Sequence, residues 1–97
     1  MKTYTICGSM RFEKEMQQAA YYLETQKGCN ILQCVYTSGS ATPTQEDLQK
    51  LQAAHYAKID LSDGIYVLNI GGYIGSAVRD EIEYAKAHGK EVIYHCG

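Results

Sequence analysis

Residues 69–85 read NIGGYIGSAVRDEIEYA, and this stretch decides the fold because it joins a strand to a helix through a glycine-rich turn. The apolar run just before it, residues 65–68, is typical of a strand covered on both faces. The glycines let the backbone turn sharply and approach a ligand closely, and Ser76 is placed to cap the helix. We therefore expect a binding site here, with the candidate contacts Asn69, Gly72, Gly75 and Ser76.

Glu81 is the candidate catalytic residue on this helix. Its neighbours three and four positions away carry no positive charge: Ala77, Val78, Tyr84 and Ala85. By contrast, Glu83 has Arg79 and Lys86 within helical reach, as on an ordinary solvated face. A carboxylate on an apolar stripe must find a hydrogen bond, a partner or a ligand, which makes it a candidate for chemistry. The alternative is that Glu81 only favours the positive end of the helix and reaches water past Ala77.

The length and charge of the chain restrict its class. Its 97 residues predict one domain spanning residues 1–97, which would bury only about 60 to 65% of its unfolded surface, so association is expected. The formal net charge of −2 provides no basic stripe and argues against a nucleic-acid polymer as partner. A small anionic ligand is compatible with this charge, because a helix end and a few cations suffice for one phosphate.

The cysteines and histidines predict a reducing compartment and no metal. The four cysteines form no C-x-x-C pair, and two of them fall in expected strands, which is typical of reduced core thiols: Cys7, Cys29, Cys34 and Cys96. The histidines show no metal-ligand spacing with the cysteines: His55, His88 and His95. No stretch is apolar enough for a signal peptide or a membrane span. We expect a cytoplasmic protein with no metal, no cofactor and no membrane contact.

Strand and helix patterns alternate along the whole chain. Strands are expected at residues 3–7, 30–35, 65–68 and 91–95, with a helix in each interval. Thr44 and Asp47 form the signature of a capping box at the start of the second helix. This order predicts an α/β fold with a small, doubly wound parallel sheet of about four strands, flavodoxin-like or Rossmann-like. Ligands in such sheets bind beyond the carboxyl ends of the strands.

The first strand is followed by a turn that could bind an anion. Gly8, Ser9, Met10 and Arg11 offer backbone N–H groups, a hydroxyl and a guanidinium at the start of a helix. The alternative is a serine cap beside a solvated arginine. This turn and the segment from Gly71 to Glu81 both lie at the carboxyl edge of the predicted sheet.

His55 lies among apolar residues of the second helix, whose predicted stripe is Leu48, Leu51, His55 and Ile59. Such a histidine is either a satisfied core residue or a proton donor that faces the cavity. The polar loop over residues 36–44 follows a strand, so it either covers the site or has no role in it.

Two segments resemble the nucleoside 2-deoxyribosyltransferase superfamily, which includes the 2'-deoxynucleoside 5'-phosphate N-hydrolases. Residues 7–11, CGSMR, resemble the C-G-S-I-R turn beside the nucleotide 5'-phosphate of the N-hydrolases. Residues 75–77 with Glu81 and Ile82 resemble the G-S-A-F-E-I of the transferases, whose glutamate is the nucleophile. The chain is closer still to small bacterial and phage proteins of this superfamily with a similar KIDLSD pattern, present here at residues 58–63.

The resemblance implies cleavage or transfer at the N-glycosidic bond of a nucleoside or nucleoside 5'-monophosphate. Glu81 would attack the anomeric carbon, and His55, which stands where the N-hydrolases have an aspartate, would protonate the leaving base. Thr5 stands where those enzymes have a tyrosine. Two other readings are a nucleotide-binding module without turnover and a purely structural protein. A homodimer or higher homo-oligomer is expected, because one subunit is unable to cover its apolar helix faces and nine tyrosines.

Overall fold

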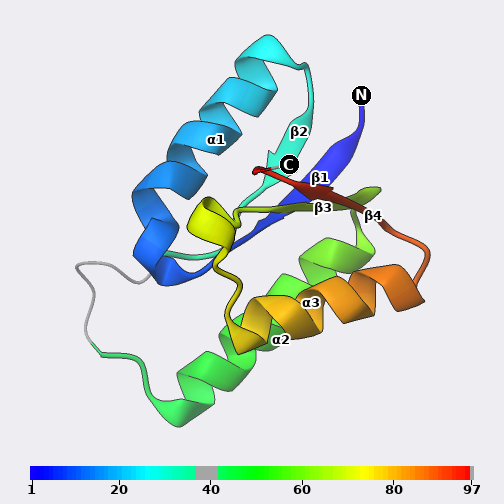
Figure 1. Ribbon diagram of the computed structural model, residues 1–97. Coiled ribbons are helices and arrows are strands. Elements are labelled where there is room, and N and C mark those ends of the chain that lie inside the picture. The colour runs from blue at the N-terminus through cyan, green and yellow to red at the C-terminus, as the bar shows by residue number, and fades with distance from the viewer. Residues whose placement is uncertain (37–41, 97) are drawn as a thin grey trace.

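The computed structural model describes residues 1–36 and 42–96, in which four parallel strands form one sheet with helices on both faces (Figure 1). The strands are β1 (Thr3–Cys7), β2 (Asn30–Leu32), β3 (Gly64–Val67) and β4 (Glu91–Tyr94). The helices are α1 (Glu13–Gln26), α2 (Gln45–Asp60) and α3 (Ser76–Ala87), with short 3₁₀ helices at Met10–Phe12 and Ile70–Gly72. The expected small α/β fold is confirmed.

The sheet has the strand order β2-β1-β3-β4, and every pairing is parallel. Thr3 pairs with Asn30 across β1 and β2, and Tyr4 pairs with Gly64 across β1 and β3. Because β2 lies on one side of β1 and β3 on the other, the chain reverses its winding direction at β1. The carboxyl ends of β1 and β3 thus lie side by side at the switch point where such sheets bind ligands.

Each face of the sheet has its own apolar core, as the alternation of side chains along β1 requires. Tyr4 and Ile6 pack in the cluster beneath α1. Cys7 packs with Ile65 and with residues of α2 and α3 in a second cluster. Figure 1 shows α1 on one face of the sheet and the pair α2 and α3 on the other.

Strand β2 is shorter than the sequence indicates. It ends at Leu32, where its pairing with Thr5 of β1 ends, whereas the apolar pattern predicted a strand to residue 35. Cys34 lies outside the strand, but it and Cys29 are partly buried and pack against the core beneath α1. The prediction of a core thiol is wrong for Cys96, which is exposed. All four cysteines are free, and Cys7 is the fully buried one.

Helix α2 begins at a capping box, and only its C-terminal part packs into the core. Thr44 Oγ1 accepts a hydrogen bond from Asp47 N, and Asp47 Oδ2 accepts one from Thr44 N, both at 3.0 Å. Ile59 is fully buried, whereas Leu48 is 47% exposed. The capping box is confirmed, but the apolar stripe is not a core stripe along its whole length.

Helix α3 begins one residue earlier than the capping prediction requires. Gly75 is the N-cap, Ser76 is the first helical residue, and no side chain caps this end. The prediction that Ser76 caps α3 is therefore wrong. The first helical hydrogen bond runs from Arg79 N to Gly75 O at 2.9 Å, so the preceding N–H groups have no acceptor within the helix.

No helix in residues 1–36 and 42–96 combines the length and the apolar character needed to span a bilayer. The loop predicted over residues 36–44 falls mostly on residues 37–41, which lie outside the described part of the chain.

The capping box gives a prediction for stability. Thr44→Ala removes the side-chain acceptor of Asp47 N, and we expect the free energy of unfolding to fall by about 1 kcal/mol in urea denaturation. The matched control is Thr42→Ala, which truncates an exposed threonine before the helix and should change stability by less than about 0.5 kcal/mol. Equal losses in the two variants would contradict a capping role.

Candidate active site

A cleft of about 440 Å³ opens at the carboxyl edge of the sheet, between the turn after β1, the segment after β2, and helices α2 and α3. Its walls are mainly apolar, and its size falls in the range of small-molecule sites, about 300 to 1,000 Å³. The residues contributed by the two helices include Leu48, Leu51 and His55 from α2 and Ala77, Val78 and Glu81 from α3.

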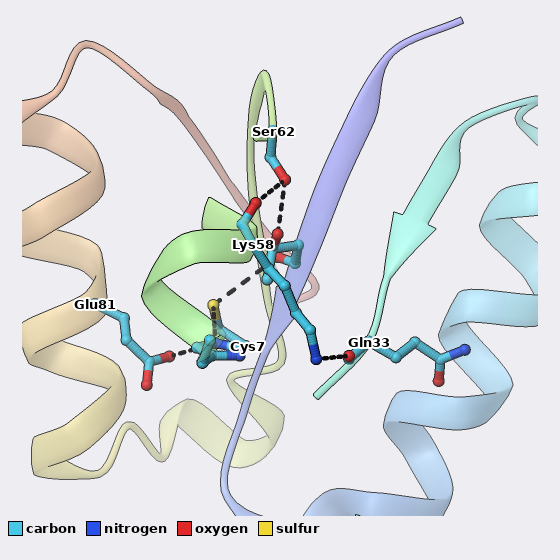
Figure 2. A network of polar contacts seen from close by, with 7 residues as sticks. Cys7, Gln33, Lys58, Ser62 and Glu81 are labelled. Atoms are coloured by element: carbon cyan, nitrogen blue, oxygen red, sulfur yellow. Dashed lines mark hydrogen bonds and ion pairs between the residues drawn. The ribbon is translucent and has the colours of Figure 1, made fainter. Parts of the chain in front are cut away.

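Three reactive side chains meet in this cleft region. Glu81 Oε1 lies 3.2 Å from His55 Nε2, and the same nitrogen lies 3.4 Å from Cys7 Sγ. In Figure 2, Glu81 projects from α3 toward Cys7, and dashed lines mark these contacts. The structure thus brings together both predicted catalytic residues, Glu81 and His55, and adds a thiol.

The fold explains why these residues meet. Cys7 is the last residue of β1, and its side chain points to the face covered by α2 and α3. His55 lies beyond the solvated start of α2, and Glu81 lies one and a half turns into α3. Figure 1 shows that α2 and α3 cover the same face of the sheet. His55 of α2 therefore lies beside both Cys7 at the end of β1 and Glu81 of α3.

Glu81 and Glu83 have different surroundings although they are two residues apart. The Glu81 side chain is 14% exposed and the His55 side chain is 12% exposed. Glu83 is exposed on the outer face of α3. The partner that Glu81 lacks on its own helix is therefore supplied by α2, and the reading in which Glu81 only extends into water does not describe its position.

The imidazole of His55 is only partly satisfied. Its Nε2 faces Glu81 and Cys7, while its buried Nδ1 has no hydrogen-bond partner among the described residues. In the tautomer that carries its proton on Nε2, this N–H can donate a hydrogen bond to the Glu81 carboxylate. The lone pair of Nδ1 then accepts no hydrogen bond from the described residues. His55 therefore lies at the wall of the cleft with a specific partner, rather than as an isolated core histidine.

Burial raises the pKa of the Cys7 thiol well above its usual range, and the nearby Glu81 carboxylate raises it further. The thiol therefore keeps its proton at neutral pH and forms only weak hydrogen bonds, such as the one it donates to Thr5 O at 3.9 Å. The same carboxylate and burial also raise the pKa of Tyr56 on α2, with burial as the larger cause.

Because the pKa of Cys7 is raised in the folded protein, the free energy of unfolding should decrease at alkaline pH. In the unfolded chain the thiol ionises near pH 8.5, whereas in the folded protein it keeps its proton to higher pH. Stability is therefore unaffected by Cys7 below that pH and falls above it, by up to about 1.4 kcal/mol per pH unit.

We expect urea denaturation between pH 7 and 10 to show a shallower fall for Cys7→Ala than for the wild type. The comparison at pH 7 to 8 is the internal control, because there the two curves should differ only by a constant loss from the smaller side chain. Curves that stay parallel up to pH 10 would contradict the raised pKa.

The predicted anion turn after β1 lies only partly in the cleft. Gly8, Ser9 and Met10 line it. Ser9 is the N-cap of the following 3₁₀ helix, and its Oγ accepts a hydrogen bond from Arg11 N at 3.4 Å. Arg11 is not among the residues that line the cleft, and its guanidinium lies 4.1 Å from the centre of the Tyr73 ring, as in a cation–π contact.

Of the four contact residues predicted at the turn before α3, only two line the cleft. Gly75 and Ser76 line the cleft, whereas Asn69 and Gly72 are not among its lining residues. The Asn69 side chain makes two hydrogen bonds to the backbone of Cys96, at 2.9 and 2.8 Å. Gly72 has a φ of 80° in the turn itself, so its role there is backbone conformation.

Two residues of the cleft region were not predicted from the sequence as site residues. Cys7 was assigned to the core, and Lys58 was not singled out. Lys58 lines the cleft, and its Nζ donates a hydrogen bond to Gln33 O at 2.8 Å, as Figure 2 shows. The available signal was its position three residues after His55, which places both side chains on one side of α2.

Comparisons of the chain with protein-family models, with curated proteins and with solved structures found no match. What the site can do chemically must therefore follow from its own atoms. It offers a carboxylate as nucleophile or base, an imidazole that can exchange a proton with it, and a cation at the cleft wall.

Proposed function

We propose that the protein cleaves or transfers the N-glycosidic bond of a nucleoside or nucleoside 5'-monophosphate, with Glu81 as the nucleophile. The observation that supports this most directly is the Glu81 carboxylate at the wall of an apolar cleft, 3.2 Å from His55 Nε2. The resemblance of residues 7–11, and of residues 75–77 with Glu81 and Ile82, to the nucleoside 2-deoxyribosyltransferase superfamily supports the same chemistry.

The proposed reaction has two displacements at the anomeric carbon. A Glu81 oxygen attacks this carbon, the bond from the carbon to the base nitrogen breaks, and its electron pair leaves with the base. Protonated His55 gives its Nε2 proton to the departing base. Water or a second base then attacks the same carbon, the ester bond to Glu81 breaks, and the proton of the attacking group returns to His55. The logic is that of a retaining glycosidase.

The cleft supports a ligand with both an apolar face and a charged end. Apolar side chains of α2 and the Tyr73 ring offer surfaces for a base, because planar rings pack well against apolar and aromatic groups. The uncapped N-terminus of α3 and the turn after β1 offer N–H groups for sugar or phosphate oxygens.

Lys58, rather than Arg11, is the proposed cation for a 5'-phosphate. It lines the cleft, whereas the Arg11 guanidinium lies against Tyr73. We expect Lys58→Met to raise the KM for a nucleoside 5'-monophosphate about 10- to 100-fold, the value of one charge-assisted hydrogen bond, and to leave the KM for the nucleoside nearly unchanged.

The matched control is Lys50→Met on the same helix, since Lys50 is exposed and pairs with Glu46 across one turn. It should leave both KM values unchanged. A similar rise for nucleoside and nucleotide in Lys58→Met would show that the residue supports the segment around Gln33 instead of the phosphate.

The direct test is release of free base from a panel of ribo- and deoxyribonucleosides and their 5'-monophosphates, followed by chromatography. Release above the buffer blank for at least one substrate is the expected result. Saturable binding of a monophosphate in calorimetry without base release would favour the alternative, a nucleotide-binding module without turnover. If no member of the panel is bound and none releases its base, both proposals are refuted.

A further inference from the structure

We propose that Cys7, His55 and Glu81 form a binding site for one divalent transition ion of the zinc class. The ligand atoms would be Cys7 Sγ, His55 Nε2 and a carboxylate oxygen of Glu81, and all lie within 4.8 Å of one another. They come from three separate elements, β1, α2 and α3. Thiolate, imidazole and carboxylate are the side-chain ligands of protein zinc sites.

Two of the three spacings between these atoms match the edges of a tetrahedron around such an ion. Ordinary zinc bond lengths place sulfur and nitrogen ligands about 3.6 Å apart, and nitrogen and oxygen ligands about 3.3 Å apart. In this protein Cys7 Sγ lies 3.4 Å from His55 Nε2, which lies 3.2 Å from Glu81 Oε1. The third spacing, between Cys7 Sγ and a Glu81 oxygen, is no more than 4.8 Å, so side-chain movements alone can bring the three ligands onto the ion.

The charges of the three ligands also fit a divalent ion. On binding, the S–H bond of Cys7 breaks, its proton passes to water, and a bond from the metal to sulfur forms. The thiolate and the Glu81 carboxylate together neutralise the two charges of the ion. His55 coordinates as the neutral imidazole through the Nε2 lone pair, so its proton moves to Nδ1.

Three protein ligands leave one position of a tetrahedral ion open. Since His55 and Glu81 line the cleft, this position is available to water, as in catalytic rather than structural zinc sites. The protonated Nδ1 would have no acceptor among the described residues, and the loss of such a supporting contact weakens metal sites about 10- to 100-fold. We therefore expect reversible binding in the micromolar range.

Metal binding has a consequence for catalysis, which rests on the proposed function. A Glu81 oxygen bound to the ion is no longer free to attack the sugar, and His55 loses the Nε2 position from which it would donate its proton. Zinc should therefore inhibit base release, and a chelator should restore it. The ion would act as a reversible inhibitor that competes with catalysis for the same two side chains.

Cobalt(II) is the probe, because it occupies zinc sites and reports its ligands by absorption. We expect chelator-treated wild-type protein, kept reduced, to bind one equivalent of Co²⁺ with a thiolate-to-cobalt band in the near ultraviolet. A triple variant with Cys29→Ser, Cys34→Ser and Cys96→Ser leaves Cys7 as the remaining thiol and should keep this band. Cys7→Ser should lose it, and Glu81→Gln should weaken binding at least tenfold, whereas the exposed control Glu83→Gln should not.

The proposal is overturned if the wild type or the triple variant shows no band up to 100 equivalents of Co²⁺, or if Cys7→Ser keeps the band. If Cys7→Ser does not fold, the triple variant alone decides the identity of the thiol. A cobalt band without base release would retain the metal site and remove the proposed function. Base release without a cobalt band would retain the proposed function and remove the metal site.

Discussion

Glu81→Gln is expected to lower base release by at least about 1,000-fold, because an amide of the same shape is not a nucleophile. The variant can keep a hydrogen bond to His55, so the loss would reflect chemistry rather than a displaced helix. The rate should be measured on the best substrate of the panel with enzyme in excess, so that slow turnover remains visible. In the wild type, acid quenching followed by peptide mass measurement should find the sugar ester on Glu81.

The matched control for this prediction is Glu83→Gln, the same substitution two residues further along α3. Glu83 is exposed and lies outside the cleft, so base release should change by less than about twofold. Equal activity in Glu81→Gln and the wild type would exclude Glu81 as the nucleophile. An ester found on another residue would do the same.

Gly64→Ala is expected to destabilise the fold by about 3 kcal/mol, because the added methyl group meets the closest contacts found for any glycine in residues 1–36 and 42–96. A Cβ at Gly64 would lie 2.4 Å from the backbone oxygen of Glu91 and 2.8 Å from its Cβ. These residues face each other in the pairing of β3 with β4, so neither backbone can retreat without breaking the ladder. Urea denaturation with a fitted slope would measure the loss.

The matched control is Gly75→Ala, a methyl group added at a glycine of ordinary backbone conformation. There the new Cβ would lie 3.4 Å from the Tyr73 hydroxyl, an ordinary contact with a mobile side chain. Its loss should stay below about 1 kcal/mol. If Gly64→Ala cost no more than Gly75→Ala, close approach of β3 and β4 would not be what requires glycine at position 64.

Those parts of the fold that depend on local pattern could be predicted from the sequence. The alternation of strands and helices, the capping box of α2 and the end of α3 at Gly89 each depend on residues a few positions apart. The end of β2 depends instead on where the neighbouring strand β1 stops pairing with it, after Thr5 and Leu32. The apolar pattern of β2 alone carries no information about where β1 stops pairing, and it therefore predicted a strand that is three residues too long.

The candidate site was predictable only in part for the same reason. Glu81 was identified because its own helix offers it no cation, and His55 because it interrupts an apolar stripe. The contact of His55 with Cys7 joins residues 48 positions apart, so it depends on the winding of the sheet. The position of Arg11 over the Tyr73 ring likewise depends on how two distant turns approach each other.

Helix α2 gains little stability from the core over its first turns, because its apolar residues there, Leu48 and Leu51, face the cleft. Its buried anchor is Ile59, near the other end. The start of the helix should therefore open locally, and exchange its amide hydrogens, more readily than α1 or α3. A ligand that fills the cleft would cover the two leucines and supply the burial they lack, so capture of the ligand and tightening of this helix would be a single event.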